Sequence, residues 1–369
     1  MTFWRDPVGW WCSLGRPLAH LSRVQAIAAI LAIVLALGWA SYATPAFDKS
    51  VGMERVETRD PDRIGDIELY RRIAARVDEG EGYYQVALDE HRNNGYPTIP
   101  FFTVRFPTAA YMGNVLGDFG WKALAMALVI GATLAWTAAL SGLTTMVERV
   151  GAIFIIAAGT ASLFLPMSRL FHDLIAGLFL TLALGLYSPK RWWPSLIFAA
   201  AALAVRELAL PFVLLWGAFA LVQRRWREAA AVAALLAVFA IGFYFHAQEV
   251  ALHRLPGDQP SPGWTEMTGP VLALAGLGSF SALILFPLAI AAPIGGIALL
   301  GWIGLGGRLG LFASLYFIGY AIMLSVFARS NNAYWILLVL PAYLGGLALV
   351  PRALLDLVRA AGAGKARRS

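Results

Sequence analysis

Long apolar runs are the feature that most constrains this chain. There are about ten of them, each about 15–25 residues long, and a helix needs about 20 residues to cross a hydrocarbon core about 30 Å thick. Of the 369 residues 59% are hydrophobic and 14% are charged, against about 45–50% and 25% in soluble domains. The pattern excludes a water-soluble globular protein and predicts an all-α, polytopic transmembrane protein. We place ten spans at 24–43, 121–141, 150–168, 173–188, 194–208, 208–223, 229–247, 280–304, 310–328 and 335–350.

The distribution of charge predicts the orientation of these spans. If the N-terminus is cytoplasmic, the inner segments are 1–23, 142–149, 189–193, 224–228, 305–309 and 351–369. They hold fifteen of the 29 basic residues but only four of the 22 acidic ones. Because inner loops carry an excess of Lys and Arg, we expect an integral membrane protein with both termini in the cytoplasm, of the bacterial inner membrane.

Other sequence features limit the classes of protein that remain. The pI near 9.7 is explained by membrane topology, since no basic patch for nucleic acid stands out. The one cysteine, Cys12, excludes an intrachain disulfide framework. The run Gly269–Gly304 is too long for one crossing, so we interpret 269–279 as an interfacial or re-entrant piece that breaks at 276–279.

We expect a single transmembrane domain over 1–369, with one large non-cytoplasmic loop at 44–120. Within this loop, 62–77 predicts an amphipathic helix with Ile67, Tyr70, Ile73, Ala74 and Val77 on its apolar face. A Gly80-Glu-Gly82 break precedes a second short helix at 83–93. Three prolines between residues 97 and 107 then predict an extended segment that borders the membrane.

Several charged residues in the apolar part lie toward the same outer side. Arg206 and Glu207 stand 12 and 13 residues after Pro194, which places them past the bilayer midplane. An unpaired charge there costs on the order of 3 kcal/mol, so this pair must face a polar cavity or each other. With residues from other segments they predict one recessed, outward-facing cavity; these are Asp66, Arg105, His172, Asp173, Arg206, Glu207 and Arg329.

The residue types in this cavity indicate the chemistry of its ligand. Arginine binds phosphate oxygens in a bidentate manner and keeps its charge. Arginines within apolar and aromatic walls suit a lipid-linked phosphate whose tail stays among the helices. Carboxylates beside them suit sugar hydroxyls or a proton-abstracting base. The combination predicts a ligand that is a lipid phosphate carrying a polar group.

Short motifs at these positions resemble the GT-C superfamily of polytopic glycosyltransferases. They are Asp66-x-x-x-Tyr70, Tyr96-Pro97, Arg105-x-Pro107, Phe171-His-Asp173, Arg206-Glu207, and Arg329 ahead of Pro341. The resemblance implies transfer of a sugar from a polyprenyl-phosphate donor to a glycan, lipid or protein acceptor on the non-cytoplasmic face. It implies that Asp66 is the general base and that Arg206, Arg329 and Arg105 bind the donor phosphate. No cofactor is required.

Other residues are assigned to acceptor binding or to support. They are Tyr70, His172, Asp173, Glu207, Tyr96, Asn332 and Tyr334. His172 suits a structural role as well as a catalytic one, Asp173 suits a helix cap as well as acceptor binding, and Glu207 is expected to pair with Arg206. Asp62, Glu68, Asp89 and Glu90 compete with Asp66 as the base.

Four alternatives remain open. A divalent metal would need Asp66, His172 and Asp173 to converge, and no ligand spacing supports such a site. A lipid or glycan transporter would place charges along a path through both leaflets. Another lipid-dependent transferase, or a non-enzymatic subunit with the loop as its docking surface, would also fit a polytopic chain.

Overall fold

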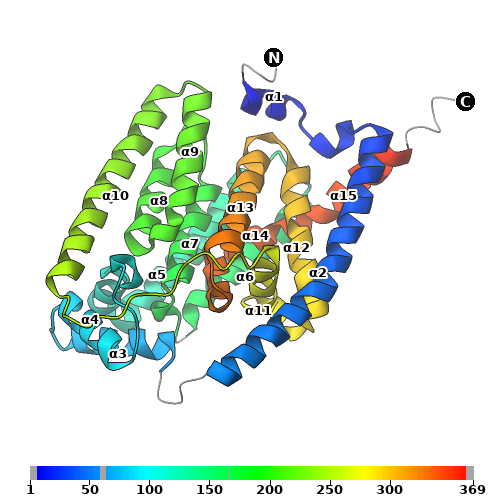
Figure 1. Cartoon of the computed structure of the whole chain (residues 1–369). Helices are drawn as coiled ribbons and strands as arrows, with labels where there is room; N and C mark the ends of the chain where they lie inside the picture. Colours follow the sequence, from blue (N-terminus) through cyan, green and yellow to red (C-terminus); the bar gives the residue numbers. More distant parts are fainter. Residues whose placement is uncertain (1–5, 59–63, 166, 363–369) are drawn as a thin grey trace, which may run out of the picture.

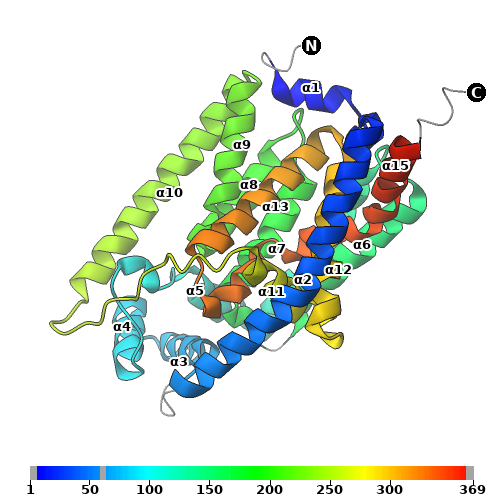
Figure 2. The same ribbon diagram turned by 45° about the vertical axis from the view of Figure 1, so that its right-hand side comes forward.

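The computed structural model describes residues 6–58, 64–165 and 167–362, with the backbone alone for 54–58. Its regular structure is helical throughout these residues, apart from one isolated bridge between Ile99 and Pro260. Figures 1 and 2 show a bundle of long helices with two short helices, α3 and α4, at one end. The predicted all-α class is confirmed for the described chain.

The α-helices are α1 (Pro7–Ser13), α2 (Arg23–Thr58), α3 (Asp66–Asp78), α4 (Tyr83–Asn93), α5 (Thr108–Leu140), α6 (Met146–Thr160), α7 (His172–Gly185), α8 (Trp193–Val205), α9 (Leu210–Val222), α10 (Trp226–Leu252), α11 (Pro270–Ser279), α12 (Leu288–Leu305), α13 (Gly307–Phe327), α14 (Leu340–Tyr343) and α15 (Val350–Gly362). Short 3₁₀ helices join them: η1 (Pro17–His20), η2 (Phe101–Thr103), η3 (Ala161–Phe164), η4 (Ser168–Leu170), η5 (Glu207–Ala209), η6 (Ala282–Leu285), η7 (Ser330–Leu338) and η8 (Leu344–Leu349).

Within the described residues, six helices are long and apolar enough to cross a membrane, or seven if the bent pair formed by η7 and α14–α15 counts as one span. This is compatible with an integral membrane protein, but the expected count of ten spans is not confirmed. The difference lies in α7, α8 and α9, which have only 14, 13 and 13 residues. At 1.5 Å per residue such helices are about 20 Å long, too short for a straight crossing.

The six segments that the charge count assigns to the inner side lie at one end of the bundle. Figure 1 shows α1, α15 and the α9–α10 turn at the end opposite α3 and α4. Contacts join several of these segments in pairs: Arg16 with Asp356, Arg352 with Leu143, and Arg225 with Pro189. Arg308 contacts Tyr187, at the end of the span that precedes 189–193. The basic segments therefore share one end, while Lys365, Arg367 and Arg368 lie outside the described residues.

The segment after the first span differs from the prediction in extent but not in kind. The helix α2 continues through Pro45 to Thr58, and α5 already begins at Thr108, so the intervening region is 59–107 and not 44–120. The second short helix has the expected bounds, Tyr83–Asn93, and residues 94–107 form no α-helix. The first amphipathic helix begins at Asp66, and it buries Leu69 together with the expected Ile73 and Val77.

The run 269–304 also departs from its prediction. The helix α11 ends at Ser279, within the predicted break, but its residues are buried against α12, α13 and η7. This burial within the protein is compatible with the re-entrant alternative. The following crossing begins only at Leu288, because the 3₁₀ helix η6 occupies Ala282–Leu285.

The helix α7 is the centre of the bundle, and all 14 of its residues are buried. It packs closely on η7 at Gly177, where an added Cβ would lie 2.2 Å from the carbonyl oxygen of Leu337. This contact sets η7 against the start of α7, which is where several of the predicted site residues lie.

Candidate functional site

A polar cavity of about 300 Å³ opens where α3, the segment after α4 and the start of η7 meet the residues between α10 and α11. We call this last segment, residues 253–269, the strap; it crosses the α3–α4 end of the bundle as an extended trace (Figures 1 and 2). Seven of the eleven predicted site residues line the cavity: Asp66, Tyr70, Tyr96, Arg105, Arg329, Asn332 and Tyr334. The structure thus brings distant stretches of the chain together.

The helices α3 and α4 form the platform that carries one wall of the cavity. Their apolar faces meet, with Leu69, Ile73 and Val77 of α3 in one buried cluster with Tyr83 and Val86 of α4. The spacing of 69, 73 and 77 places these α3 residues on one face of the helix. This packing fixes the first turn of α3, and with it Asp66, beside the extended segment that follows α4.

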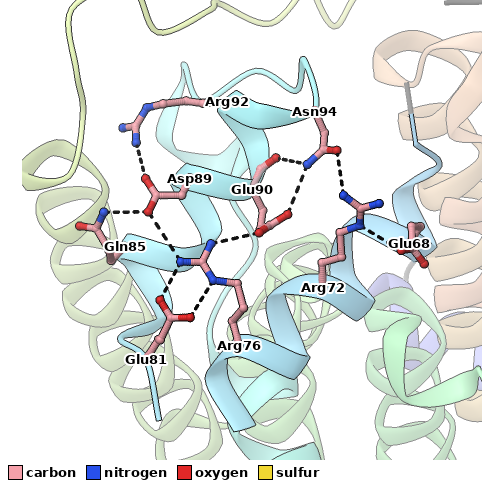
Figure 3. A network of polar contacts seen from close by, with 9 residues as sticks. All are labelled: Glu68, Arg72, Arg76, Glu81, Gln85, Asp89, Glu90, Arg92 and Asn94. Carbon is pink, nitrogen blue, oxygen red and sulfur yellow. Dashed lines mark hydrogen bonds and ion pairs between the residues drawn. The ribbon is translucent and has the colours of Figure 1, made fainter. Parts of the chain in front are cut away.

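Ion pairs on the outer face connect the same two helices (Figure 3). Arg76 of α3 points between two carboxylates and donates to Glu81 at 2.7 Å and to Glu90 at 3.0 Å. Hydrogen bonds from Arg71 and then Arg72 hold the pKa of Glu68 at about 2, well below its ordinary value. Exposed pairs of this kind contribute little to stability singly, so the network chiefly sets the register of α3 on α4.

A further ion pair attaches the strap to the platform. Arg92 of α4 donates to Asp258 at 2.7 Å and to Asp89 at 3.0 Å. Beside it, backbone bonds run from Thr98 N to Gln259 O at 3.1 Å and from Ser261 N to the carbonyl of Ile99 at 2.6 Å. The strap is therefore held at the rim of the cavity by both charge and backbone pairing.

Asp66 is the one carboxylate among the residues that line the cavity. It is exposed at the first turn of α3, and its Oδ1 accepts a hydrogen bond from the Tyr96 hydroxyl at 2.9 Å. No arginine or lysine of the described chain lies within ion-pair distance of it. The other carboxylates considered as the base do not face this cavity. Glu68, Asp89 and Glu90 pair with arginines and do not line it. Asp62 lies outside the described residues.

Arg105 faces the cavity from the extended segment and is only 9% exposed. Its Nε donates to the Tyr70 hydroxyl at 3.0 Å, and its Nη2 donates to the Tyr334 hydroxyl at 3.1 Å. Within the described residues no carboxylate forms an ion pair with it. The guanidinium is thus held by two neutral hydroxyls instead of by a carboxylate.

Arg329 reaches the cavity from the start of η7. Its Cζ lies 4.3 Å from the centre of the Trp264 ring, and its Nη2 donates to the Ser261 hydroxyl at 3.3 Å. Its Nε is buried without a hydrogen-bond partner. No carboxylate of the described chain forms an ion pair with Arg329 either. The cavity is therefore lined by one carboxylate and by two guanidiniums that have no ion-pair partner among the described residues.

Arg206 does not line the cavity, contrary to its predicted role at the donor phosphate. It is fully buried at the end of α8, where its Nε donates to Asp173 at 2.9 Å and its Nη1 donates to Glu207. The pairing of Glu207 with Arg206 is confirmed. Because carboxylates occupy these two donors, this arrangement suits a structural cation better than one that binds a ligand directly.

Asp173 and His172 lie at the start of α7, behind the cavity wall. The cap role considered for Asp173 is wrong, because α7 has no side-chain cap and the carboxylate accepts from Arg206 instead. His172 is buried with its ring centroid 4.9 Å from that of Tyr70, and its Nδ1 faces the carbonyl of Leu170 at 3.2 Å. These contacts favour a structural histidine.

Asn332 orders the residues around Arg329. Its Oδ1 accepts from the backbone N–H of Arg329 at 3.3 Å, and its Nδ2 donates to the Tyr334 hydroxyl at 3.3 Å. Tyr334 therefore contacts both Asn332 and Arg105, and it links η7 to the extended segment. Both residues support the arginines by fixing their surroundings.

Two parts of the cavity were missed by sequence reasoning. His91 of α4 lines it and donates from Nδ1 to the Pro97 carbonyl at 2.9 Å, and its burial lowers its pKa to about 4. The strap contributes Gln259, Pro260, Pro262 and Trp264. Its prolines and polar residues mark it as a loop, but no local signal indicates which cavity it borders.

A second, apolar cavity of about 730 Å³ lies on the other side of η7. Its walls are formed by α6, the start of α7 and the η7–α14 bend, with Phe154, Phe171, Leu174, Leu337 and Leu340 among them. The 3₁₀ helix η7 thus borders the polar cavity with its first residues and the apolar cavity with its last ones.

The comparisons with family models, with curated proteins and with solved structures find no match to this chain. Among the described residues, no group of three or more His, Cys, Asp or Glu side chains is arranged to hold a metal ion. The geometry of the cavity is therefore the observation that bears on what this protein does.

Proposed function

We propose that this protein is a membrane glycosyltransferase that moves a sugar from a polyprenyl-phosphate donor to a glycan, lipid or protein acceptor. The observation that carries the proposal is the cavity in which Arg105 and Arg329, neither paired with a carboxylate, face the same space as Asp66. A phosphate supplies the anion that two such guanidiniums lack. Both termini then lie in the cytoplasm, and the cavity opens on the non-cytoplasmic face of the bacterial inner membrane.

The reaction is a direct displacement at the anomeric carbon. The acceptor oxygen attacks this carbon while Asp66 takes the proton of its hydroxyl. The bond between the anomeric carbon and the phosphate oxygen breaks, and its electron pair leaves with the polyprenyl phosphate. Arg105 and Arg329 stabilise the charge that develops on the leaving phosphate, because their donors are already held in place.

The apolar cavity supports a lipid-linked donor and not a soluble sugar nucleotide. The first isoprene units would lie against Phe171 and Leu337 while the phosphate lies beyond η7. The base is oriented by Tyr96, whose hydroxyl contacts Asp66 at 2.9 Å. Arg206, paired with Asp173 and Glu207, joins the end of α8 to the start of α7 behind Arg105 and Arg329.

The test is turnover by purified protein with a panel of polyprenyl-phosphate sugars and a mixture of acceptors, with released polyprenyl phosphate measured by mass spectrometry. Asp66→Asn is expected to lower turnover at least about 100-fold, the contribution typical of a general base, and to leave donor binding unchanged. The matched control is Glu68→Gln on the same helix, which faces Arg71 and Arg72 outside the cavity and is expected to retain turnover.

Two outcomes would contradict the proposal. Failure of the wild-type protein to release polyprenyl phosphate from any donor would exclude the transferase and favour a transporter of lipid or glycan. Turnover that Asp66→Asn leaves intact would remove Asp66 as the base, and another lipid-dependent transferase would then fit better.

A further inference from the structure

Arg329 is held by an aromatic ring instead of an acid. Its Cζ lies 4.3 Å from the centre of the Trp264 ring, well within the range of a cation–π interaction. A carboxylate in this place would neutralise the charge and occupy two N–H donors. The face of a ring attracts the cation but leaves the donors at its edge available, so this contact keeps Arg329 ready for an anion.

Trp264 is itself packed against a second aromatic ring. Its ring stacks on Trp335 with centroids 5.7 Å apart and an angle of 22° between the planes. Trp335 in turn lies 5.7 Å from the Cζ of Arg206, and Arg206 is immobilised by two carboxylates. The four side chains form a continuous stack from the buried ion cluster to the cavity.

The stack connects segments that are far apart in the sequence. Trp264 belongs to the strap, while Trp335 and Arg329 belong to η7 and its start. The strap is joined to this side by two more contacts, Ser330 N to Glu266 at 2.7 Å and Arg329 Nη2 to Ser261 at 3.3 Å. The orientation of Arg329 therefore depends on where the strap places the Trp264 ring.

We propose that Trp264 is a positioning residue that holds the Arg329 guanidinium toward the phosphate of a lipid phosphate ligand. The inference rests on the proposed function, since it assigns a role within the same phosphate site. Trp264 acts through Arg329 and makes no contact of its own with the phosphate.

A double-mutant cycle tests this role with farnesyl phosphate, a short isoprenoid phosphate, as the probe. The dissociation constant is measured by calorimetry on detergent-solubilised full-length protein for the wild type, Arg329→Gln, Trp264→Ala and the double variant. Arg329→Gln is expected to weaken binding about 10–100-fold, the loss of a charge-assisted hydrogen bond. Trp264→Ala is expected to weaken it about 3–10-fold in the wild type and not at all in the Arg329→Gln background.

The matched control is Trp193→Ala at the start of α8, away from the cavity. It removes another arginine–tryptophan contact, in which the Cζ of Arg191 lies 5.6 Å from the centre of the Trp193 ring. It is expected to leave binding unchanged. Trp264→Phe keeps an aromatic face and is expected to bind with intermediate affinity, which provides a second variant if the alanine variant does not fold.

The outcomes separate this inference from the proposed function. If Trp264→Ala weakens binding equally in both backgrounds, Trp264 acts only through packing of the strap and the inference is overturned. The same follows if Trp264→Ala and Trp264→Phe both bind like the wild type while Arg329→Gln does not. If the wild-type protein does not bind farnesyl phosphate, the phosphate site of the proposed function fails first.

Discussion

Asp173 forms an ion pair that its position in the sequence does not predict. It was expected either to cap α7 or to bind the acceptor, and it instead accepts from the fully buried Arg206 at 2.9 Å. Pairing was foreseeable from the cost of a buried charge, and the Arg206–Glu207 pair followed from it. That Asp173 is the second partner of Arg206 could not be predicted, because it depends on how α7 packs beside α8.

Asp173→Asn should destabilise the protein by about 1.5–3 kcal/mol, the value of a hydrogen bond to a charged group, since Glu207 still compensates part of the Arg206 charge. Unfolding of the solubilised protein by denaturant measures this change. The control is Asp118→Asn, because Asp118 is 89% exposed and 3.5 Å from Arg169; it should lie within about 0.5 kcal/mol of the wild type. Equal effects would show that the buried cluster is not structural.

His91 predicts a dependence of stability on pH. Burial lowers its folded-state pKa to about 4, against about 6.5 in an unfolded chain. Between these values the unfolded chain binds a proton that the folded chain does not, so stability is complete above about pH 6.5 and falls as the pH drops toward 4. The loss is on the order of 3 kcal/mol over this window.

Melting of the wild type and of His91→Asn at pH 7.5 and pH 5.0 tests this dependence. The asparagine amide can replace the contact to Pro97 but does not titrate, so the variant should lose less stability on acidification. An identical loss in both proteins would assign the effect to another group.

Elements were predicted with uneven success, and the reasons are physical. The helix Tyr83–Asn93 and the proline-rich segment after it follow from local signals, namely Gly80, Gly82 and three prolines. The short helices α7, α8 and α9 were taken as full spans because their apolar residues suggest lipid contact. In α7 those residues face other helices instead, as its complete burial shows, and hydropathy alone does not distinguish the two environments.

The contact between α7 and η7 predicts a strong effect of one methyl group. In Gly177→Ala the new Cβ would lie 2.2 Å from the Leu337 carbonyl oxygen and 2.9 Å from Leu338 Cα, both backbone atoms. Overpacking of this kind costs about 1–3 kcal/mol, and it should also weaken binding of farnesyl phosphate by displacing η7.

Gly319→Ala in α13 is the control, because nothing lies within 4 Å of its added Cβ. It should retain wild-type stability and binding, since alanine is the better helix former. If Gly177→Ala matched it in both measurements, the close packing of η7 on α7 would not position the cavity.

At the scale of the whole molecule, the charge count predicted which segments share an end of the bundle. Three contacts between those segments agree with it. The cavity was foreseen as a meeting of the first loop, α7, α8 and η7. Asp66, Arg105 and Arg329 line it as expected, whereas His172, Asp173, Arg206 and Glu207 at the ends of α7 and α8 do not. The strap was not foreseen as a wall, since Trp264 and Arg329 are 65 positions apart and only the folded chain brings them together.

The orientation in the membrane is tested with single cysteines in a Cys12→Ala background. Asp89→Cys on α4 should react with a membrane-impermeant maleimide added to spheroplasts, because α4 lies at the predicted outer end (Figure 1). Arg224→Cys, at the α9–α10 turn, should react only after permeabilisation. The opposite pattern would place the cavity on the cytoplasmic side.

The central claim is that this cavity holds the phosphate of a lipid-linked sugar between two arginines and opposite one acid. An experimental structure with a bound polyprenyl-phosphate sugar tests it most directly. We predict that the phosphate contacts the guanidiniums of Arg105 and Arg329 and that the anomeric carbon faces Asp66. A phosphate bound elsewhere, or an anomeric carbon turned away from Asp66, would contradict the account.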